Sequence, residues 1–292
     1  MANVPDADKV QNMETSTEDE SNAKVVKLSE SHINQERYPF RSGSGIAVIV
    51  NNTEFQPQLN LPDRTGSDVD AASLDQTFQE LGFKSDLLND ATTEDILKQF
   101  NKIKEDKNNL KKTDCLVVVL LTHGDEECIY ATNMKMKIKS IMDEFNSQQC
   151  PELILKPKIF IFQACRGDQI GRGANVNVNR DPNEADAAAD YTGGYDEMFG
   201  ETIRIPNEAD FLAVYSSSPG YASFRNTEKG SAFARYLSKE LRKMKKGEDI
   251  YKVLTRVNRN VGTNYKPSYP NSNAVQMPCF VSHLTKELVL IQ

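Results

Sequence analysis

Apolar runs alternate with amphipathic stretches through most of this chain. Three continuous hydrophobic runs cover residues 45–50, 115–121 and 158–162. Runs of this kind are typical of parallel strands that are buried on both faces. Elsewhere apolar residues recur at helical spacing, first at Ala71, Leu74, Phe78 and Leu81. Alternation of such strands with helices predicts an α/β fold, in which helices flank a mostly parallel central sheet.

The same patterns predict the remaining elements. We expect a short strand at 83–88, a strand at 209–215 and a last strand at 275–283. Amphipathic spacing predicts helices near 92–104, 137–146, 233–244 and 250–261. The chain has 292 residues, which is enough for one large α/β domain. We expect residues 37–292 to form that single domain.

Two segments break the pattern. Residues 1–36 are polar and acidic, and a segment with so few large apolar groups cannot bury enough surface to become ordered. We therefore expect a disordered tail there. Residues 171–200 are rich in Gly, Asn, Asp and Ala without an apolar period. Long loops of this kind are usually functional or disordered, so this segment is a candidate flexible linker.

Charge and composition exclude several classes of function. The net charge of -7 and a pI near 5.2 argue against nucleic-acid binding, which needs a basic face. No apolar run approaches the ~20 residues of a membrane span, and the first twenty residues lack the features of a signal peptide. The five cysteines include no CxxC pair, so we expect no metal site and no cofactor. Together these features predict a cytoplasmic protein.

One cysteine and one histidine stand out by position. Cys165 directly follows the apolar run at 158–162, and His123 follows the run at 115–121. Carboxyl ends of parallel strands share one edge of a sheet, where ligands usually bind. Of the other histidines, His32 lies in the polar tail and His283 ends the last strand. A nearby histidine can convert a thiol into the more nucleophilic thiolate.

Each of these residues taken alone has an unremarkable interpretation. A single cysteine is most often a small hydrophobic residue of a core, and a single histidine is usually structural or exposed. The pairing of Cys165 with His123 at two strand ends favours nucleophilic catalysis instead. Gly124, directly after the histidine, would let the backbone approach a ligand closely.

Five motifs occur in order along the chain. They are Arg64–Asp70 (RTGSDVD), Leu121–Gly124 (LTHG), Gln163–Gly167 (QACRG), Ile205–Leu212 (IPNEADFL) and Ser218–Asn226 (SPGYASFRN). In these motifs the chain resembles a caspase of the effector type, which has a short prodomain. The similarity runs from about Arg41 to the C-terminus. It implies a caspase-type three-layer sandwich and a cysteine endopeptidase that cleaves after Asp.

The resemblance also implies roles for individual residues. Cys165 would attack the scissile carbonyl, and His123 would protonate the leaving amine. The backbone N–H groups of Gly124 and Cys165 would hold the oxyanion. The substrate-binding residues implied are Arg64, Gln163, Ser223, Phe224, Arg225 and Asn226. Among these, Arg64, Gln163 and Arg225 would line the pocket for the P1 side chain, because guanidinium groups match a carboxylate.

The family's organisation implies maturation by cleavage. Residues 1–36 would be the prodomain, 37–186 the large subunit and 187–292 the small subunit of a zymogen. Asp181 precedes a proline, whereas Asp186 follows Asn183-Glu184-Ala185 and precedes a small residue. We therefore expect cleavage after Asp186. The same pentapeptide recurs at 206–210, where we expect burial to protect it because a core strand follows directly.

Partners also follow from the resemblance. The active form would be a homodimer of processed units joined along residues 275–281, with proteins carrying a P1 Asp as substrates. Upstream initiator caspases and inhibitor-of-apoptosis proteins would act on it, and execution of apoptosis would be its function. No nucleic acid or membrane partner is expected.

Two other classes of protein compete with this interpretation. A catalytically silent caspase-like regulator or decoy should have lost His123, Cys165 or an arginine of the P1 pocket, and none is lost. A relative that cleaves after Arg or Lys would need acidic residues in place of Arg64 and Arg225.

The chain has no tryptophan, and Ala222 stands where effector relatives carry an aromatic wall. We therefore expect broad preference at P2 and P4.

Overall fold

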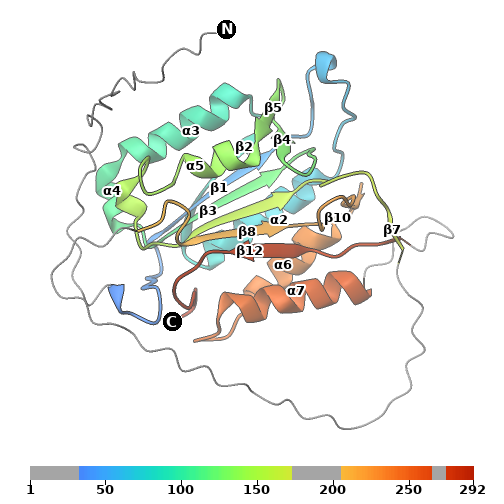
Figure 1. Cartoon of the computed structure of the whole chain (residues 1–292). Coiled ribbons are helices and arrows are strands. Elements are labelled where there is room, and N and C mark those ends of the chain that lie inside the picture. The colour runs from blue at the N-terminus through green and yellow to red at the C-terminus, as the bar shows by residue number, and fades with distance from the viewer. Residues whose placement is uncertain (1–32, 173–204, 265–273) are drawn as a thin grey trace, which may run out of the picture.

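The computed structural model describes residues 33–172, 205–264 and 274–292. The predicted prodomain up to residue 32, the linker from residue 173 and its proposed cleavage site at Asp186 lie outside the described residues. The remainder is built around one sheet with helices on both sides (Figure 1).

The central sheet has six strands in the order β12-β8-β6-β3-β1-β2. The strands are β1 (Gly45–Asn51), β2 (Phe83–Asn89), β3 (Cys115–Leu121), β6 (Lys158–Gln163), β8 (Phe211–Tyr215) and β12 (Cys279–Ser282). All neighbouring pairs are parallel except β8 with β12, which is antiparallel. The mostly parallel sheet predicted from the apolar runs is confirmed.

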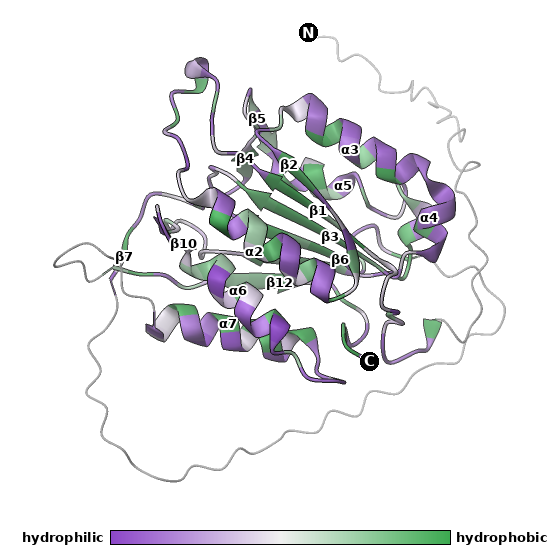
Figure 2. Ribbon diagram, turned by 180° about the vertical axis from the view of Figure 1, so that it is seen from behind, coloured by the Kyte–Doolittle hydropathy of each residue, from purple (hydrophilic) through white to green (hydrophobic). Residues whose placement is uncertain are grey.

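Two groups of helices cover the sheet and make it a three-layer sandwich (Figures 1 and 2). One face carries α2 (Ser67–Glu80), α6 (Ala232–Arg242) and α7 (Ile250–Asn264). The other carries α3 (Thr93–Glu105), α4 (Lys107–Lys112) and α5 (Ile138–Asp143). Figure 2 shows apolar strands in the middle and polar outer faces on the helices, as expected when each helix buries only one stripe.

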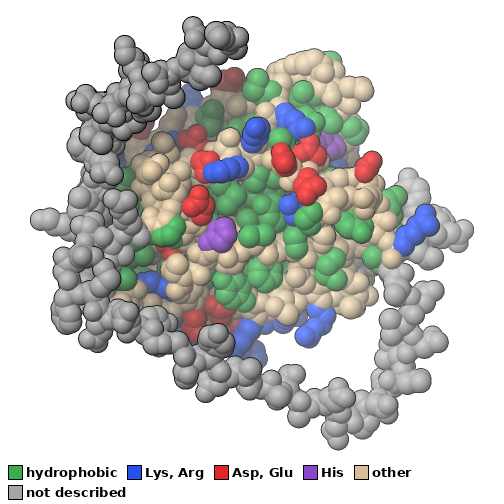
Figure 3. All heavy atoms as spheres, viewed as in Figure 1, with side chains coloured by type: hydrophobic (Ala, Val, Ile, Leu, Met, Phe, Trp, Pro, Cys, Tyr) green, Lys and Arg blue, Asp and Glu red, His purple; other side chains and the backbone are tan. Residues whose placement is uncertain are grey.

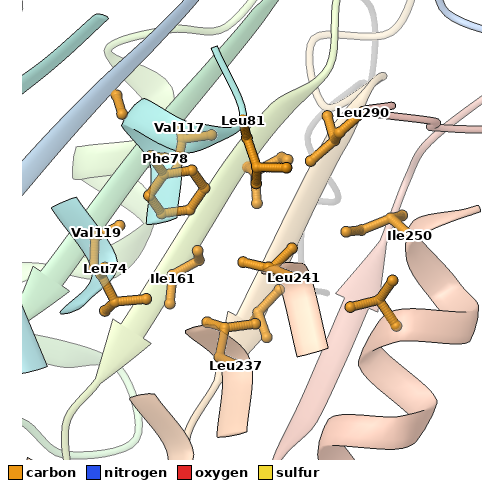
Figure 4. Close-up of a cluster of buried hydrophobic side chains, with 14 of the residues drawn as sticks. Leu74, Phe78, Leu81, Val117, Val119, Ile161, Leu237, Leu241, Ile250 and Leu290 are labelled. Carbon is orange, nitrogen blue, oxygen red and sulfur yellow. The ribbon is translucent and has the colours of Figure 1, made fainter. Parts of the chain in front are cut away.

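The two faces of the sheet produce two hydrophobic clusters. Side chains alternate across a strand, so Val117 and Val119 of β3 pack toward α2 and α6 whereas Val118 and Leu120 pack toward α3 and α5. Figure 4 shows the first cluster, in which Phe78 and Leu241 close over the strands. These layers fix the strand ends rigidly, which is what a precisely arranged site at the sheet edge requires.

Short pairings that the apolar pattern did not predict border the sheet. They are β4 (Cys128–Tyr130) with β5 (Lys135–Lys137), β9 (Arg225–Asn226) with β10 (Gly230–Ser231), and β7 (Gly171–Arg172) with β11 (Ala274–Val275). Two 3-10 turns, η1 (Pro57–Leu59) and η2 (Pro151–Leu153), were also not predicted. Elements of two or three residues are too short to show a periodicity.

The predicted single strand at 275–283 is wrong. The chain instead forms β11, which ends at Val275, and β12, which begins at Cys279. Pro278 has no N–H to give to a ladder, and the side chain of Gln276 is buried. The break therefore separates an edge strand of the main sheet from a small pairing near the loops.

Within the described ranges, no helix is long and apolar enough to cross a membrane. The same residues contain no cluster of three or more His, Cys, Asp or Glu side chains that could hold a metal ion.

Candidate active site

The parallel pairing of β3 with β6 brings His123 and Cys165 to one edge of the sheet. Leu121 at the end of β3 is in register with Gln163 at the end of β6, and Thr122 N–H donates to the Gln163 carbonyl at 3.2 Å. His123 and Cys165 each follow two positions later on adjacent strands. The other described histidine, His283, lies at the opposite end, where its carbonyl accepts from Asp210 N–H at the start of β8.

Gly124 packs directly against the cysteine. A Cβ atom at this position would lie 3.0 Å from Ala164 Cβ, 2.8 Å from the Cys128 carbonyl and 3.2 Å from the Cys165 carbonyl. Contacts this close leave no room for a side chain. The glycine therefore lets the loop after His123 lie against the residue that carries the thiol.

His123 is oriented by a backbone carbonyl. Its Nε2 lies 2.8 Å from the Pro62 carbonyl oxygen, and because a carbonyl only accepts, the neutral ring must carry its proton on Nε2. Burial lowers the pKa of His123, and the charges of Arg64 and Arg225 lower it further, whereas the Pro62 carbonyl opposes them. The ring is therefore neutral at pH 7, with Nδ1 as the nitrogen able to accept a proton.

The thiol of Cys165 lies against the backbone of Ser223. Ser223 N–H points at Sγ from 3.4 Å, and the Ser223 carbonyl is 3.7 Å from Sγ. Cys165 is only partly buried, so a ligand can reach the sulfur. By contrast, Cys115 at the start of β3 is fully enclosed, and burial raises the pKa of its thiol.

Arg64 is buried in the turn between β1 and α2, with 1% of its surface exposed. Its guanidinium donates to the Asn52 carbonyl at 2.9 Å, to Ser67 Oγ at 2.8 Å and to the Gln163 carbonyl at 3.5 Å. Burial, and then the charge of Arg225, lower the pKa of Arg64 to about 9. The group therefore remains a cation at neutral pH, held in a fixed orientation.

Arg225 reaches the same place from β9. Its Nε donates to the Thr65 carbonyl at 3.1 Å, and burial lowers its pKa while the charges of Asp70 and Cys165 oppose that effect. Neither Arg64 nor Arg225 forms an ion pair with any carboxylate of the described residues. The two guanidinium groups therefore lie near each other and near Asp70, without an ion pair to any described carboxylate.

Gln163 and Asn226 contribute polar groups around this region. Gln163 Nε2 donates to Ser223 Oγ at 2.9 Å, whereas its Oε1 is buried without a partner in the described structure. Asn226 Oδ1 accepts from the N–H groups of Glu228 and Lys229, each at 2.9 Å. Asn226 therefore also shapes the turn between β9 and β10.

The sequence did not predict three residues that hold parts of the candidate active site. Pro62 acts through its carbonyl, which no sequence pattern can show. Asp70 holds the hairpin that carries Arg225, since both of its oxygens accept from Ser231 N–H at 2.8 and 3.0 Å. Its position inside the motif 64–70 was the available signal. Gln276 holds the main chain at Phe224, and its sequence context gives no signal at all.

The repeated pentapeptide at 206–210 behaves as expected. Ala209 and Asp210 are buried, Asp210 with 1% of its surface exposed, and β8 follows directly. The expected burial of this copy is confirmed, and its protection from cleavage remains a prediction.

Comparison with known proteins adds a family to this geometry. Residues 44–289 match the model of the caspase domain. The chain is 39% identical to caspase-3 of Oryctolagus cuniculus over 84% of this chain and 83% of that protein. It is 37% identical to caspase-7 of Gallus gallus over 84% of this chain and 76% of that protein.

A solved structure agrees with these matches. Caspase-1 from Spodoptera frugiperda superposes with a TM-score of 0.75 at 32% identity, covering 89% of this chain and 94% of that chain. The resemblance seen in the motifs is confirmed over nearly the whole described fold. The chain belongs to the caspase family and is a cysteine-type endopeptidase.

Proposed function

We propose that this protein cleaves protein substrates on the carboxyl side of aspartate. The observation that carries the proposal is a pair of guanidinium groups, buried Arg64 and half-buried Arg225. Neither forms an ion pair with a described carboxylate, and both lie close enough to Cys165 for their charges to interact. A substrate aspartate supplies an ion-pair partner. Neutral isosteres would leave both cations without one, which is strongly unfavourable.

The geometry supports specific chemical roles. Cys165 transfers its proton to His123, whose free Nδ1 can accept it because Nε2 is bound to the Pro62 carbonyl. The thiolate attacks the scissile carbonyl, and the N–H groups of Gly124 and Cys165 hold the oxyanion. The protonated His123 then gives its proton to the leaving amine. Water hydrolyses the remaining thioester and returns the thiol.

We place maturation in the segment that follows β7. A zymogen cut after Asp186 would yield a large subunit from residue 37 and a small subunit from residue 187, after removal of the prodomain 1–36. The burial of Asp210 supports the choice of Asp186 over the second copy of the same pentapeptide. N-terminal sequencing of the small subunit tests this choice, and a start at Phe211 would contradict it.

The active form is a homodimer joined at β12. This strand is an outer strand of the six-stranded sheet, and the side chains of Val281 and Met277 are each 51% exposed. Hydrophobic side chains gather near the middle of the face in Figure 3, where β12 lies in the matching view of Figure 1. Exposed apolar surface on an edge strand favours a twofold contact. Sedimentation that finds an active monomer would overturn this assembly.

The biological role that fits is execution of apoptosis in the cytoplasm, downstream of initiator caspases and under inhibitor-of-apoptosis proteins. Family membership supports it. The decoy alternative is disfavoured because His123, Cys165, Arg64 and Arg225 are all present and assembled at one sheet edge.

A peptide-library cleavage profile of the purified protein tests the proposed specificity. We expect a strong requirement for Asp at P1 and no cleavage by the Cys165→Ala variant. Cleavage that depends on Cys165 but occurs equally well after Asn or Glu would contradict the assignment of the P1 pocket. Absence of cleavage by correctly processed wild-type dimer would favour the decoy.

A further inference from the structure

Gln276 is a buried side chain between β11 and β12 that reaches the active site. Only 3% of its surface is exposed. Its Nε2 donates to the Ser216 carbonyl at 2.7 Å and to Ser223 Oγ at 3.3 Å, and its Oε1 accepts from Phe224 N–H at 2.9 Å. Both ends of the amide are therefore used, and they connect the end of β8 with the segment 223–224.

That segment is placed between the nucleophile and the P1 pocket. Ser223 N–H lies 3.4 Å from the sulfur of Cys165, and its hydroxyl oxygen accepts from Gln163 Nε2. The next residue after Phe224 is Arg225. A shift of Ser223 and Phe224 would therefore move the wall beside the thiol and the guanidinium that receives the P1 carboxylate, together.

The main chain of this segment is held by a side chain. Phe224 N–H is bound by the amide of Gln276 instead of by a neighbouring strand, and regular pairing begins only with Arg225 in β9. Hydrogen bonds in a buried network are costly to leave unmade. Loss of the Gln276 amide would leave the Phe224 N–H and the Ser216 carbonyl each without this partner.

We propose that Gln276 is a positioning residue for the P1 pocket, acting through Ser223 and Phe224 on Arg225. The inference rests on the proposed function, because it concerns the same pocket. Gln276 touches neither the thiol nor the catalytic histidine. Its effect should therefore be on the alignment of the pocket with the nucleophile more than on the intrinsic reactivity of Cys165.

The position of Gln276 also connects the pocket with distant parts of the chain. The preceding residues Ala274 and Val275 pair with Arg172 and Gly171 at the start of the linker, and β12 follows at Cys279. Gln276 therefore lies between two pairings, and both fix the backbone on either side of it. The P1 pocket is thus completed by a segment that is remote from it in sequence.

The test replaces Gln276 with Leu, which has a similar size and no hydrogen-bonding groups. We expect KM for a P1-Asp tetrapeptide to rise at least tenfold and the preference for Asp over Glu at P1 to fall at least threefold. The rate constant for alkylation of Cys165 by iodoacetamide should change less than threefold. Enzyme concentration is taken from titration of active sites, so a smaller folded fraction does not alter kcat, and KM is independent of enzyme concentration.

Two further variants keep the test decisive. Ser223→Ala removes the hydroxyl that accepts from both Gln163 and Gln276. In the double variant Gln276→Leu with Ser223→Ala, the effects on KM should be less than additive, because both substitutions act on one segment. Gln276→Met, which fills the same space with a flexible side chain, replaces the leucine variant if that one does not fold. Tyr38→Phe is the matched control, since it removes buried hydrogen bonds at the opposite end of the sheet and should leave KM unchanged.

An unchanged KM in Gln276→Leu, or full additivity with Ser223→Ala, would overturn the inference. The P1 preference of the wild-type protein tests the proposed function separately. If that protein does not require Asp at P1, the pocket itself is misassigned. If it does require Asp and the Gln276 variants match it, only the positioning role fails.

Discussion

The two ends of the central sheet both bury charged groups, yet they use them differently. At the amino ends of β6 and β8, Lys158 and Asp210 are 2% and 1% exposed. At the carboxyl ends, Arg64 is 1% exposed and Arg225 lies beside it. Burial alone therefore does not distinguish the candidate active site from the rest of the molecule.

The amino end is closed by hydrogen bonds among its own groups. Tyr38 Oη and Thr285 Oγ1 both donate to Asp210 Oδ1 at 2.7 Å. Lys158 Nζ donates to the carbonyls of Leu153 and Lys156. Burial lowers the pKa of Lys158 to about 8, and the charge of Asp210 opposes that effect. Lys286 is a second buried cation near Asp210. Fixed protein groups thus hold Lys158 and Asp210, and this arrangement connects β6, β8 and the chain ends.

The carboxyl end also has more cations than carboxylates, and its cations are arginines. Two guanidinium groups face a single buried carboxylate, Asp70, and that carboxylate already accepts twice from Ser231 N–H. Gln163 Oε1 is buried without a partner in the described structure. Asp210 Oδ2 at the amino end is also buried without a partner in the described structure, so unused hydrogen-bonding capacity does not distinguish the two ends. The carboxyl end differs because its cations lie close to the partly exposed thiol of Cys165, where a ligand can reach them.

The largest difference should appear between the two cysteines of β3 and β6. Cys165→Ala should lower peptide hydrolysis by about three orders of magnitude or more, because it removes the nucleophile. Cys115→Ala should leave kcat/KM within twofold and lower the free energy of unfolding by roughly 1 kcal/mol, through a small cavity. Steady-state kinetics and denaturant unfolding of both variants measure this. Comparable losses of activity would erase the distinction between the two ends.

The next largest difference in kcat/KM is expected between substitutions of Arg225 and of Lys158. Arg225→Gln should lower kcat/KM for P1-Asp substrates about 100-fold, because a charge-assisted contact with the substrate carboxylate is lost. Lys158→Met should change kcat/KM less than twofold, since Lys158 contacts only the closed end. Parallel kinetics on one substrate series decide the matter. A large activity loss in Lys158→Met would show that the two ends are coupled.

Asp70 gives a pH-dependent test. Burial raises the pKa of Asp70 to about 6 from an ordinary value of 3.8, so the folded protein binds this proton more tightly than the unfolded chain. The associated stability is complete below pH 4 and is lost as the pH rises through about 6. Asp70→Asn keeps an acceptor for Ser231 N–H without that titration. At pH 7 it should be more stable than the wild type, by about 2 kcal/mol.

Unfolding of Asp70→Asn and wild type at pH 4, 6 and 8 supplies the measurement for Asp70. The stability difference should grow from pH 4 to 8. A stability difference that is independent of pH would show that Asp70 does not titrate in this range. The carboxyl end would then tolerate the charge of Asp70 as well as the amino end tolerates that of Asp210.

The smallest effect is expected at the closed end. Tyr38→Phe removes the hydroxyl that donates to Asp210 and accepts from Thr285 N–H, which should cost about 1 kcal/mol of unfolding free energy. Because no part of this cluster contacts the candidate site, kcat and KM should stay unchanged. Thermal unfolding together with kinetics tests both statements, and a shifted KM would refute the separation of the two ends.

The sequence by itself determined the layers and the chemistry. Continuous apolar runs specified the parallel strands because only a strand covered on both faces is apolar throughout. Those runs also ended at His123 and Cys165, so strand order and ordinary α/β topology were enough to bring the pair to one edge. The motifs then pointed to the arginines proposed for the P1 pocket, although no hydrophobic pattern could have done so.

Only the tertiary structure decided how these residues are held. The Pro62 carbonyl that fixes the His123 ring is a backbone group, present at every position and therefore invisible as a pattern. Gln276 acts from more than fifty residues beyond Phe224, and Pro278 divides a segment whose apolar content resembled one continuous strand. Hydrogen bonds between distant segments depend on where the folded chain places them. The local sequence indicates the secondary-structure propensity of each segment, but it does not indicate which distant residues the segment will contact.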